Sequence, residues 1–123
     1  MPISSTYDRS KDLTVFTATG VLTFDEHMAV LRDLYKDHPT RNVLWDMRGM
    51  TGERLSSDEL RRMISFIKLH EVKRPGGKTA IVTSTDLDFG LSRMSDALGE
   101  SEQLPWRIRG FRSMEEAVKW LEE

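Results

Sequence analysis

One short pattern, a serine or threonine followed three residues later by a glutamate, occurs three times between strand-like and helix-like segments. The pairs are Thr23 with Glu26, Ser56 with Glu59, and Ser113 with Glu116. In such a capping box the hydroxyl accepts a hydrogen bond from a free amide of the first helical turn, and the carboxylate accepts one from the amide of the cap residue. The boxes therefore predict three helix starts, each directly after a strand.

Five segments have the residue patterns of strands. The segment 42–47 is apolar from Val43 to Trp45, which is typical of a strand buried on both faces of a parallel sheet. The segment 105–111 instead alternates, with Ile108 between two arginines, and this predicts a strand at the sheet edge with one face in water. The other expected strands are residues 3–8, 13–19 and 78–84.

Helical segments separate all of these strands except the first two, which gives the order β-β-α-β-α-β-α-β-α. Strands joined through a helix run parallel, with right-handed crossovers. The short polar turn at residues 9–12 instead makes the first two strands an antiparallel hairpin. The sequence therefore predicts one α/β domain over residues 1–123, with a mixed, mostly parallel five-stranded sheet and an antiparallel N-terminal strand.

Composition excludes several classes of protein. The chain of 123 residues has no cysteine, which rules out disulfides, thiolate nucleophiles and zinc–thiolate sites. Its formal net charge of −2, with both signs interleaved, argues against nucleic-acid binding. No apolar run approaches the ~20 residues that span a bilayer, and residues 1–4 carry no secretion signal. We therefore expect no membrane span and a cytoplasmic location.

No catalytic constellation can be assembled from the sequence. The histidines His27, His38 and His70 lie in different predicted helices at no metal-ligand spacing, and no serine stands in a Gly-x-Ser-x-Gly turn. The segment 76–79, Gly-Gly-Lys-Thr, lacks the earlier glycine of a phosphate-binding loop and precedes a strand instead of following one. We expect a protein that is not an enzyme and that has no cofactor and no metal site.

Three stretches resemble the SpoIIAA-like family, the fold group of STAS domains. They are Gly-Val-Leu-Thr at 20–23, the strand 42–46 that ends in aspartate, and the pattern F-x-S-x-E-E-A-x-x-W-L at 111–121. The resemblance covers nearly the whole chain and implies a βα superhelix with strands in sequential order. It also implies a non-enzymatic regulatory or protein-interaction module. Relatives near the Sec14 lipid-binding group have ligand clefts, so the alternative is a small-molecule or lipid carrier that uses the cleft at the carboxyl ends of the strands.

The same resemblance makes Ser56 and Ser57 candidates for a phosphorylation switch. STAS regulators carry a phosphorylatable serine in an Asp-Ser-x-Gly step at the start of the helix after the central strand. This chain has two serines there but lacks that pattern. A phosphate at this helix start would be stabilised by free amides and by the helix dipole. The alternative is that Ser56 serves only as the N-cap.

A second candidate site is the rim at which the parallel strands end. Its residues are Asp46, Arg48, Ser84, Thr85, Asp86 and Arg93. Ligands favour this edge of open α/β sheets, and Arg48 or Arg93 would offer a counter-charge to a small anion. The alternative is that Asp46 and Arg48 pair locally and that Asp86 is the N-cap of the following helix.

A protein partner is expected on the sheet itself. If the helices all cover one face of the sheet, the other face stays partly bare. Side chains expected to form a moderately apolar patch there are Val15, Thr17, Thr19, Leu44, Ile81 and Thr83. Such a patch is where we expect an unidentified partner or a second copy of the chain to dock, with a homodimer as the expected state.

Overall fold

The computed structural model describes residues 3–36, 39–52, 55–70, 74, 76–101 and 107–123. Within this part of the chain the strands are β1 (Ile3–Asp8), β2 (Leu13–Gly20), β3 (Asn42–Met50), β4 (Lys78–Val82) and β5 (Arg107–Phe111). The helices are α1 (Phe24–Lys36), α2 (Ser57–Leu69), α3 (Asp86–Ser101) and α4 (Met114–Glu122). None of these helices is long and apolar enough to cross a membrane.

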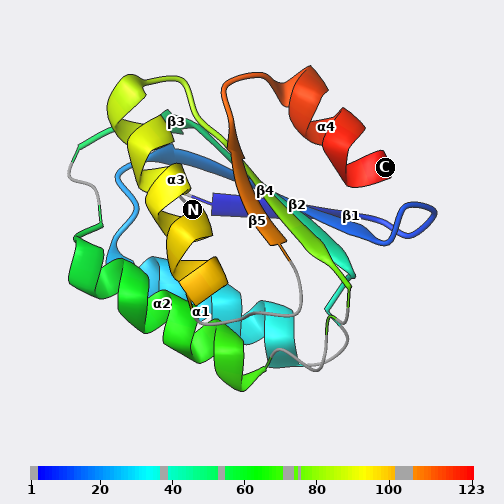
Figure 1. Cartoon of the computed structure of the whole chain (residues 1–123), viewed down its shortest axis with the longest axis horizontal. Helices are drawn as coiled ribbons and strands as arrows, with labels where there is room; N and C mark the ends of the chain where they lie inside the picture. Colours follow the sequence, from blue (N-terminus) through cyan, green and yellow to red (C-terminus); the bar gives the residue numbers. More distant parts are fainter. Residues whose placement is uncertain (1–2, 37–38, 53–54, 71–73, 75, 102–106) are drawn as a thin grey trace.

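The strands form one sheet in the order β1-β2-β3-β4-β5 (Figure 1). β1 pairs antiparallel with β2, and the other neighbours pair in parallel. The predicted α/β fold with a mixed, mostly parallel sheet is therefore confirmed. β5 lies at the edge, where Ile108 is buried and its two arginine neighbours are exposed, as the alternating sequence predicts.

Two of the predicted capping boxes form completely. Ser56 Oγ accepts a hydrogen bond from the Glu59 amide at 3.1 Å, and the Glu59 carboxylate accepts one from the Ser56 amide at 2.9 Å. Thr23 and Glu26 make the same two bonds at 3.2 and 3.0 Å. At Ser113 the hydroxyl accepts from the Glu116 amide at 3.3 Å. Each box places the start of a helix at the carboxyl end of a strand.

Helices cover both faces of the sheet (Figure 1). Helices α1, α2 and α3 lie on one face, called the first face, and α4 lies on the second face. Because neighbouring side chains of a strand point to opposite faces, Val43 and Trp45 of β3 pack in the first layer while Leu44 packs in the second. The condition for a bare second face, that all helices cover one face of the sheet, is therefore not met. α4 instead packs its buried residues Ala117 and Trp120 against Leu44 of the second layer.

The predicted bare patch is accordingly divided between the two faces. Ile81 and Thr83 lie on the first face, beneath α1 to α3. Leu44 is on the second face but has only 1 % of its surface exposed, because α4 covers it. What stays uncovered beside α4 is the part of β2 with half-buried Val15 and exposed Thr17. This uncovered surface is smaller and more polar than the patch predicted from the sequence.

β3 continues to Met50, three residues beyond its predicted end. Its register with β2 shifts between the pairs Thr17 with Asp46 and Thr19 with Gly49, so β3 holds one extra residue at this point. Such a bulge reverses the alternation of side chains, and as a result Met47 and Met50 both face the first layer.

Helix α3 packs very closely on the edge strand β5. A Cβ atom built on Gly110 would lie 2.0 Å from Ser92 Oγ and 2.8 Å from Ser92 Cβ. The glycine therefore lets the helix backbone come near the strand. This contact fixes α3 as one wall of the first layer.

Replacing Gly110 with alanine is expected to destabilise the fold by about 1–3 kcal/mol, because the new methyl group overpacks this contact. The matched control is Gly90→Ala in α3, where an added Cβ meets nothing within 4 Å. That change is expected to stabilise the protein by roughly 0.5–1 kcal/mol through helix propensity. Urea unfolding of both variants measures the difference, and equal effects would contradict the close packing of α3 on β5.

Candidate functional site

A cavity of about 120 Å³ lies between the first face of the sheet and helices α1, α2 and α3. Most of its wall is apolar, with side chains from α1, α2, α3, β3, β4 and β5, including Leu31, Trp45, Met50, Ile64, Ile81 and Leu91. An engineered apolar cavity of about 150 Å³ is known to hold benzene. The cavity therefore has the size and surface of a site for a small, mainly apolar molecule.

Two polar side chains in this wall have no hydrogen-bond partner among the described residues. Both ring nitrogens of His27 and the hydroxyl of Thr79 are unpaired. His27 is only 4 % exposed and Thr79 only 5 %. A buried polar group without a partner costs about 1–3 kcal/mol. Since these side chains line the cavity, a molecule bound there is placed to supply the missing partners.

His27 sits in the first turn of α1 against the indole of Trp45, with the ring centroids 6.0 Å apart. Burial lowers the pKa of His27 to about 4, and the carboxylates of Glu26 and Glu59 only partly oppose this. The ring is therefore neutral at pH 7 and has one N–H donor and one acceptor nitrogen. It offers a directional hydrogen bond and no charge.

The opposite end of the cavity is closed by a buried cation, Arg74, which is 2 % exposed. Its guanidinium donates at 2.9–3.2 Å to the carbonyl oxygens of Thr40, Arg41 and Lys78 and to the hydroxyl of Tyr35. These bonds connect the start of β3 and of β4 to the last turns of α1. In the sequence, an arginine shortly before a glycine pair is typical of a helix end, so no local signal reveals this burial.

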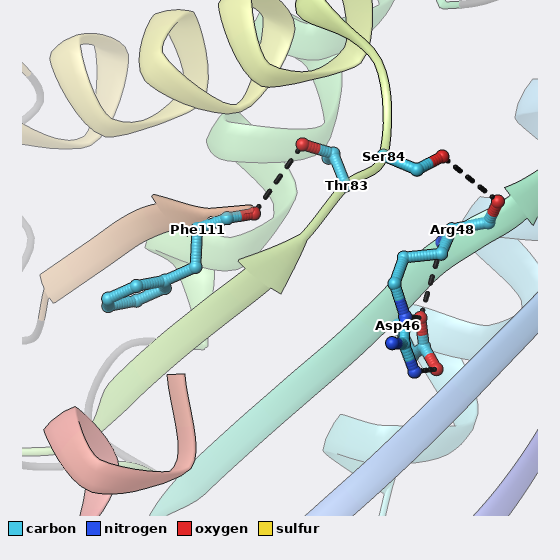
Figure 2. A network of polar contacts seen from close by, with 5 residues as sticks. All are labelled: Asp46, Arg48, Thr83, Ser84 and Phe111. Atoms are coloured by element: carbon cyan, nitrogen blue, oxygen red, sulfur yellow. Dashed lines mark hydrogen bonds and ion pairs between the residues drawn. The ribbon is translucent and has the colours of Figure 1, made fainter. Parts of the chain in front are cut away.

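Two further hydroxyls of the wall are already engaged. Ser92 donates to the Phe89 carbonyl oxygen at 2.7 Å, and Thr83 donates to the Phe111 carbonyl oxygen at 3.5 Å. The Thr83 contact ties the end of β4 to the end of β5 (Figure 2). His27 and Thr79 differ from these hydroxyls because their polar atoms have no such bond among the described residues.

The rim predicted from the sequence lies outside this cavity, and none of its six residues belongs to the wall. Asp46 and Arg48 pair with each other on β3 (Figure 2). The guanidinium donates from Nε and Nη2 to the two carboxylate oxygens, both at 2.9 Å. Hydrogen bonding from Arg48 lowers the pKa of Asp46. This is the local pair that was the alternative to a ligand contact.

The other rim residues make local contacts or point to solvent. Ser84 donates to the Arg48 carbonyl oxygen at 3.2 Å (Figure 2). Thr85 accepts from the Asp88 amide at 3.1 Å, so the N-cap of α3 is Thr85 and not Asp86. Asp86 instead pairs with the guanidinium of Arg112.

Arg93, the last of the rim residues, is exposed and lies two turns into α3. The structure therefore does not bring it together with Asp46 and Arg48 by any hydrogen bond among the described residues. A ligand at the rim stays a prediction, and the cavity is the better candidate site.

The two candidate switch residues occupy different positions at the start of α2. Ser56 is the N-cap, and its hydroxyl is engaged in the capping box with Glu59. Ser57 is the first residue of the helix and its side chain is exposed. Modification of either serine stays a prediction. In the described part of the chain, no group of three or more histidine, aspartate or glutamate side chains is arranged to hold a metal ion.

The sequence contains one signal for this site. His27 lies directly before Met28 and four residues before Leu31, both on the apolar stripe of α1. A titratable residue beside such a stripe faces the core as α1 packs. Thr79 has no comparable signal, because a threonine in a strand is ordinary.

Comparison with known proteins assigns no family to this chain. No family model matches the sequence, and no curated protein matches it at a significant level. The function is therefore inferred from the geometry and chemistry of the cavity.

Lowering the pH from 7 to 5 is expected to reduce the free energy of unfolding by about 2 kcal/mol through His27 alone. The unfolded chain takes up a proton on this residue near its usual pKa of 6.5, whereas the folded protein does so only at about 4. Stability is therefore lost as the pH falls between these values, and this contribution becomes constant below about 4. Urea unfolding at pH 5, 6 and 7 measures the change.

The control is His27→Phe, which keeps a ring in the wall and removes the titrating group. This variant is expected to be at least as stable as the wild type at pH 7, because it no longer buries unpaired nitrogens. Its stability should change much less between pH 7 and pH 5. The same pH dependence in both proteins would show that His27 is not the group responsible.

Proposed function

We propose that this domain is a non-enzymatic binding module that holds a small, mainly apolar molecule in the cavity beneath α1, α2 and α3. The observation that carries this proposal is the pair of buried polar groups, His27 and Thr79, which have no partner among the described residues and lie in a mainly apolar wall. Small-molecule sites in proteins commonly combine an apolar lining with a few polar groups that orient the ligand. This corresponds to the small-molecule carrier implied as an alternative by the sequence, with the site moved from the rim to the interior.

The exposure of the wall supports entry of a ligand. Ile81 belongs to β4, which has a paired strand on each side, and yet it is only half-buried. The side chains of Leu55, Met63 and Leu91 in the same wall are also half-buried. These residues lie just before α2, on α2 and on α3, and we expect a ligand to enter between these two helices.

The chemistry of the wall supports binding over catalysis. A general base has to lie within hydrogen-bond reach of the group that it activates. His27 makes no hydrogen bond to a hydroxyl or carboxylate among the described residues, and the hydroxyls of Thr83 and Ser92 are held by backbone carbonyl oxygens. The polar groups of the wall are therefore suited to orient a ligand.

A regulatory or protein-interaction module of the SpoIIAA/STAS-like type is the second proposal. It is supported by exposed Ser57 at the first position of α2, where a phosphate would meet free amides of the first helical turn. The two proposals are compatible, since ligand binding beneath α2 can alter the surface that α2 presents. A protein partner, a homodimer and a cytoplasmic location stay predictions from the sequence.

Filling the cavity is expected to abolish binding without unfolding the protein. In Ile81→Phe the larger ring occupies space at the floor of the cavity, so n-hexanol and indole should no longer stabilise the fold. In the wild type, a probe at ten times its dissociation constant raises the free energy of unfolding by about 1.4 kcal/mol. Thermal unfolding with increasing probe concentration measures this effect. The matched control is Leu69→Phe on the outer side of α2, where Leu69 is 80 % exposed.

Loss of the ligand effect in Ile81→Phe, with a normal effect in Leu69→Phe, is the expected result. Equal stabilisation of both variants would place the binding elsewhere on the molecule. If no probe stabilises even the wild type at high concentration, the ligand-binding proposal is wrong.

The switch is tested by Ser57→Asp, which adds a negative charge at the start of α2. It is expected to change the set of proteins that purified, immobilised domain retains, while the fold is unaffected because the side chain is exposed. Ser65→Asp, at an exposed position within the same helix, controls for added charge. Identical profiles for the wild type and Ser57→Asp would count against a switch at this serine.

A further inference from the structure

We infer that the ligand is a neutral, elongated molecule with a hydrogen-bonding group at each end, one bound by His27 and the other by Thr79. This inference rests on the proposed function and specifies the chemical class of the ligand. Examples of the class are straight-chain diols and molecules with a hydroxyl at one end and a carbonyl or amide at the other.

The elements that carry the two unpaired groups place them toward different ends of α1. His27 and Tyr35 both line it from α1, and a helix rises 1.5 Å per residue, so their backbones are about 12 Å apart. The Tyr35 hydroxyl accepts from Arg74 at 3.1 Å. The same guanidinium donates to the carbonyl oxygen of Lys78 at 2.9 Å, and Thr79 is the next residue. Thr79 is therefore near the Tyr35 end, remote from His27.

The wall between these ends is apolar. Leu31 of α1, Ile64 and Ile67 of α2, and Ile81 of β4 contribute to it. A polar group in the middle of the ligand would lose its water without gaining a hydrogen bond there, which weakens binding. The middle of the ligand is therefore a hydrocarbon chain or a similar apolar unit.

Both ends of the ligand are uncharged. At one end, His27 is neutral at pH 7 because burial lowers its pKa to about 4, and the negative charges of Glu26 and Glu59 disfavour a carboxylate. At the other end the guanidinium of Arg74 already donates to three backbone carbonyl oxygens and to Tyr35. Thr79 contributes a neutral hydroxyl. The buried carboxyl group of Asp88 also lines the cavity and disfavours a carboxylate, while the buried guanidinium of Arg74 disfavours a cation. The site therefore selects hydrogen-bonding groups without charge.

The test compares a series of diols, from 1,4-butanediol to 1,10-decanediol, with the mono-alcohol and the carboxylic acid of each chain length. Binding is followed by isothermal titration calorimetry and by the fluorescence of Trp45, which lines the cavity. At the chain length that matches the cavity, the diol is expected to bind about tenfold more tightly than the mono-alcohol, because one more buried group gains a partner. The acid should bind more weakly than the mono-alcohol.

Two variants test whether His27 and Thr79 bind the two ends of the ligand. In His27→Phe and in Thr79→Val, the diol should lose its tenfold advantage and bind about as tightly as the mono-alcohol binds to the wild type. Thr79→Ser keeps the hydroxyl and should keep the advantage. Circular dichroism and the melting temperature of each variant show that the fold is intact.

The outcomes separate this inference from the proposed function. If mono-alcohols and diols of every length bind equally well, and Ile81→Phe still abolishes binding, the cavity binds ligands but the two-ended class is wrong. The inference is also wrong if the diol keeps its advantage in both His27→Phe and Thr79→Val, or if the acids bind most tightly. If no member of the series binds, both the inference and the proposed function are overturned.

Discussion

The buried guanidinium of Arg74 holds together the end of the molecule at which the parallel strands begin. Its hydrogen bonds connect the start of β3 and β4 to Tyr35 near the end of α1. Removing one partner of a buried, hydrogen-bonded charge usually costs about 3–5 kcal/mol. The contact therefore fixes how α1 lies over the sheet, and the shape of the space beneath α1 depends on it. The other helices of this layer are set by their caps and by the contact of α3 with Gly110.

The two layers of the protein pack differently, and this difference places the site. On the second face, α4 buries Ala117 and Trp120 against Leu44 and Val82 of the sheet. On the first face, three helices leave a cavity and two polar side chains that have no partner within the described part of the chain. Unpaired buried groups lower stability by about 1–3 kcal/mol each. A ligand that forms hydrogen bonds with these groups would raise the free energy of unfolding. Ligand binding and stability are therefore coupled.

The position of the site also follows from the irregular end of β3. Ligands of open α/β sheets favour the carboxyl ends of the strands, but here the polar residues at that edge, such as Asp46 and Arg48, satisfy one another. The bulge in β3 turns Met50 toward the helices beside Met47, which extends an apolar surface under α1 to α3. The polar residues at the strand ends are therefore separate from the apolar cavity beneath the helices.

The sequence by itself determined the element order, the mixed parallel sheet and the edge position of β5, because hydrophobic periodicity and capping boxes act over a few residues. It also placed Ser56 as an N-cap. Only the tertiary structure decided that α4 crosses to the second face, that Arg74 is buried, and that His27 and Thr79 share one cavity. These features depend on contacts between residues far apart in the chain, 39 residues apart for Arg74 and Tyr35. Local patterns contain no information about such contacts, since packing and burial arise only when the layers assemble.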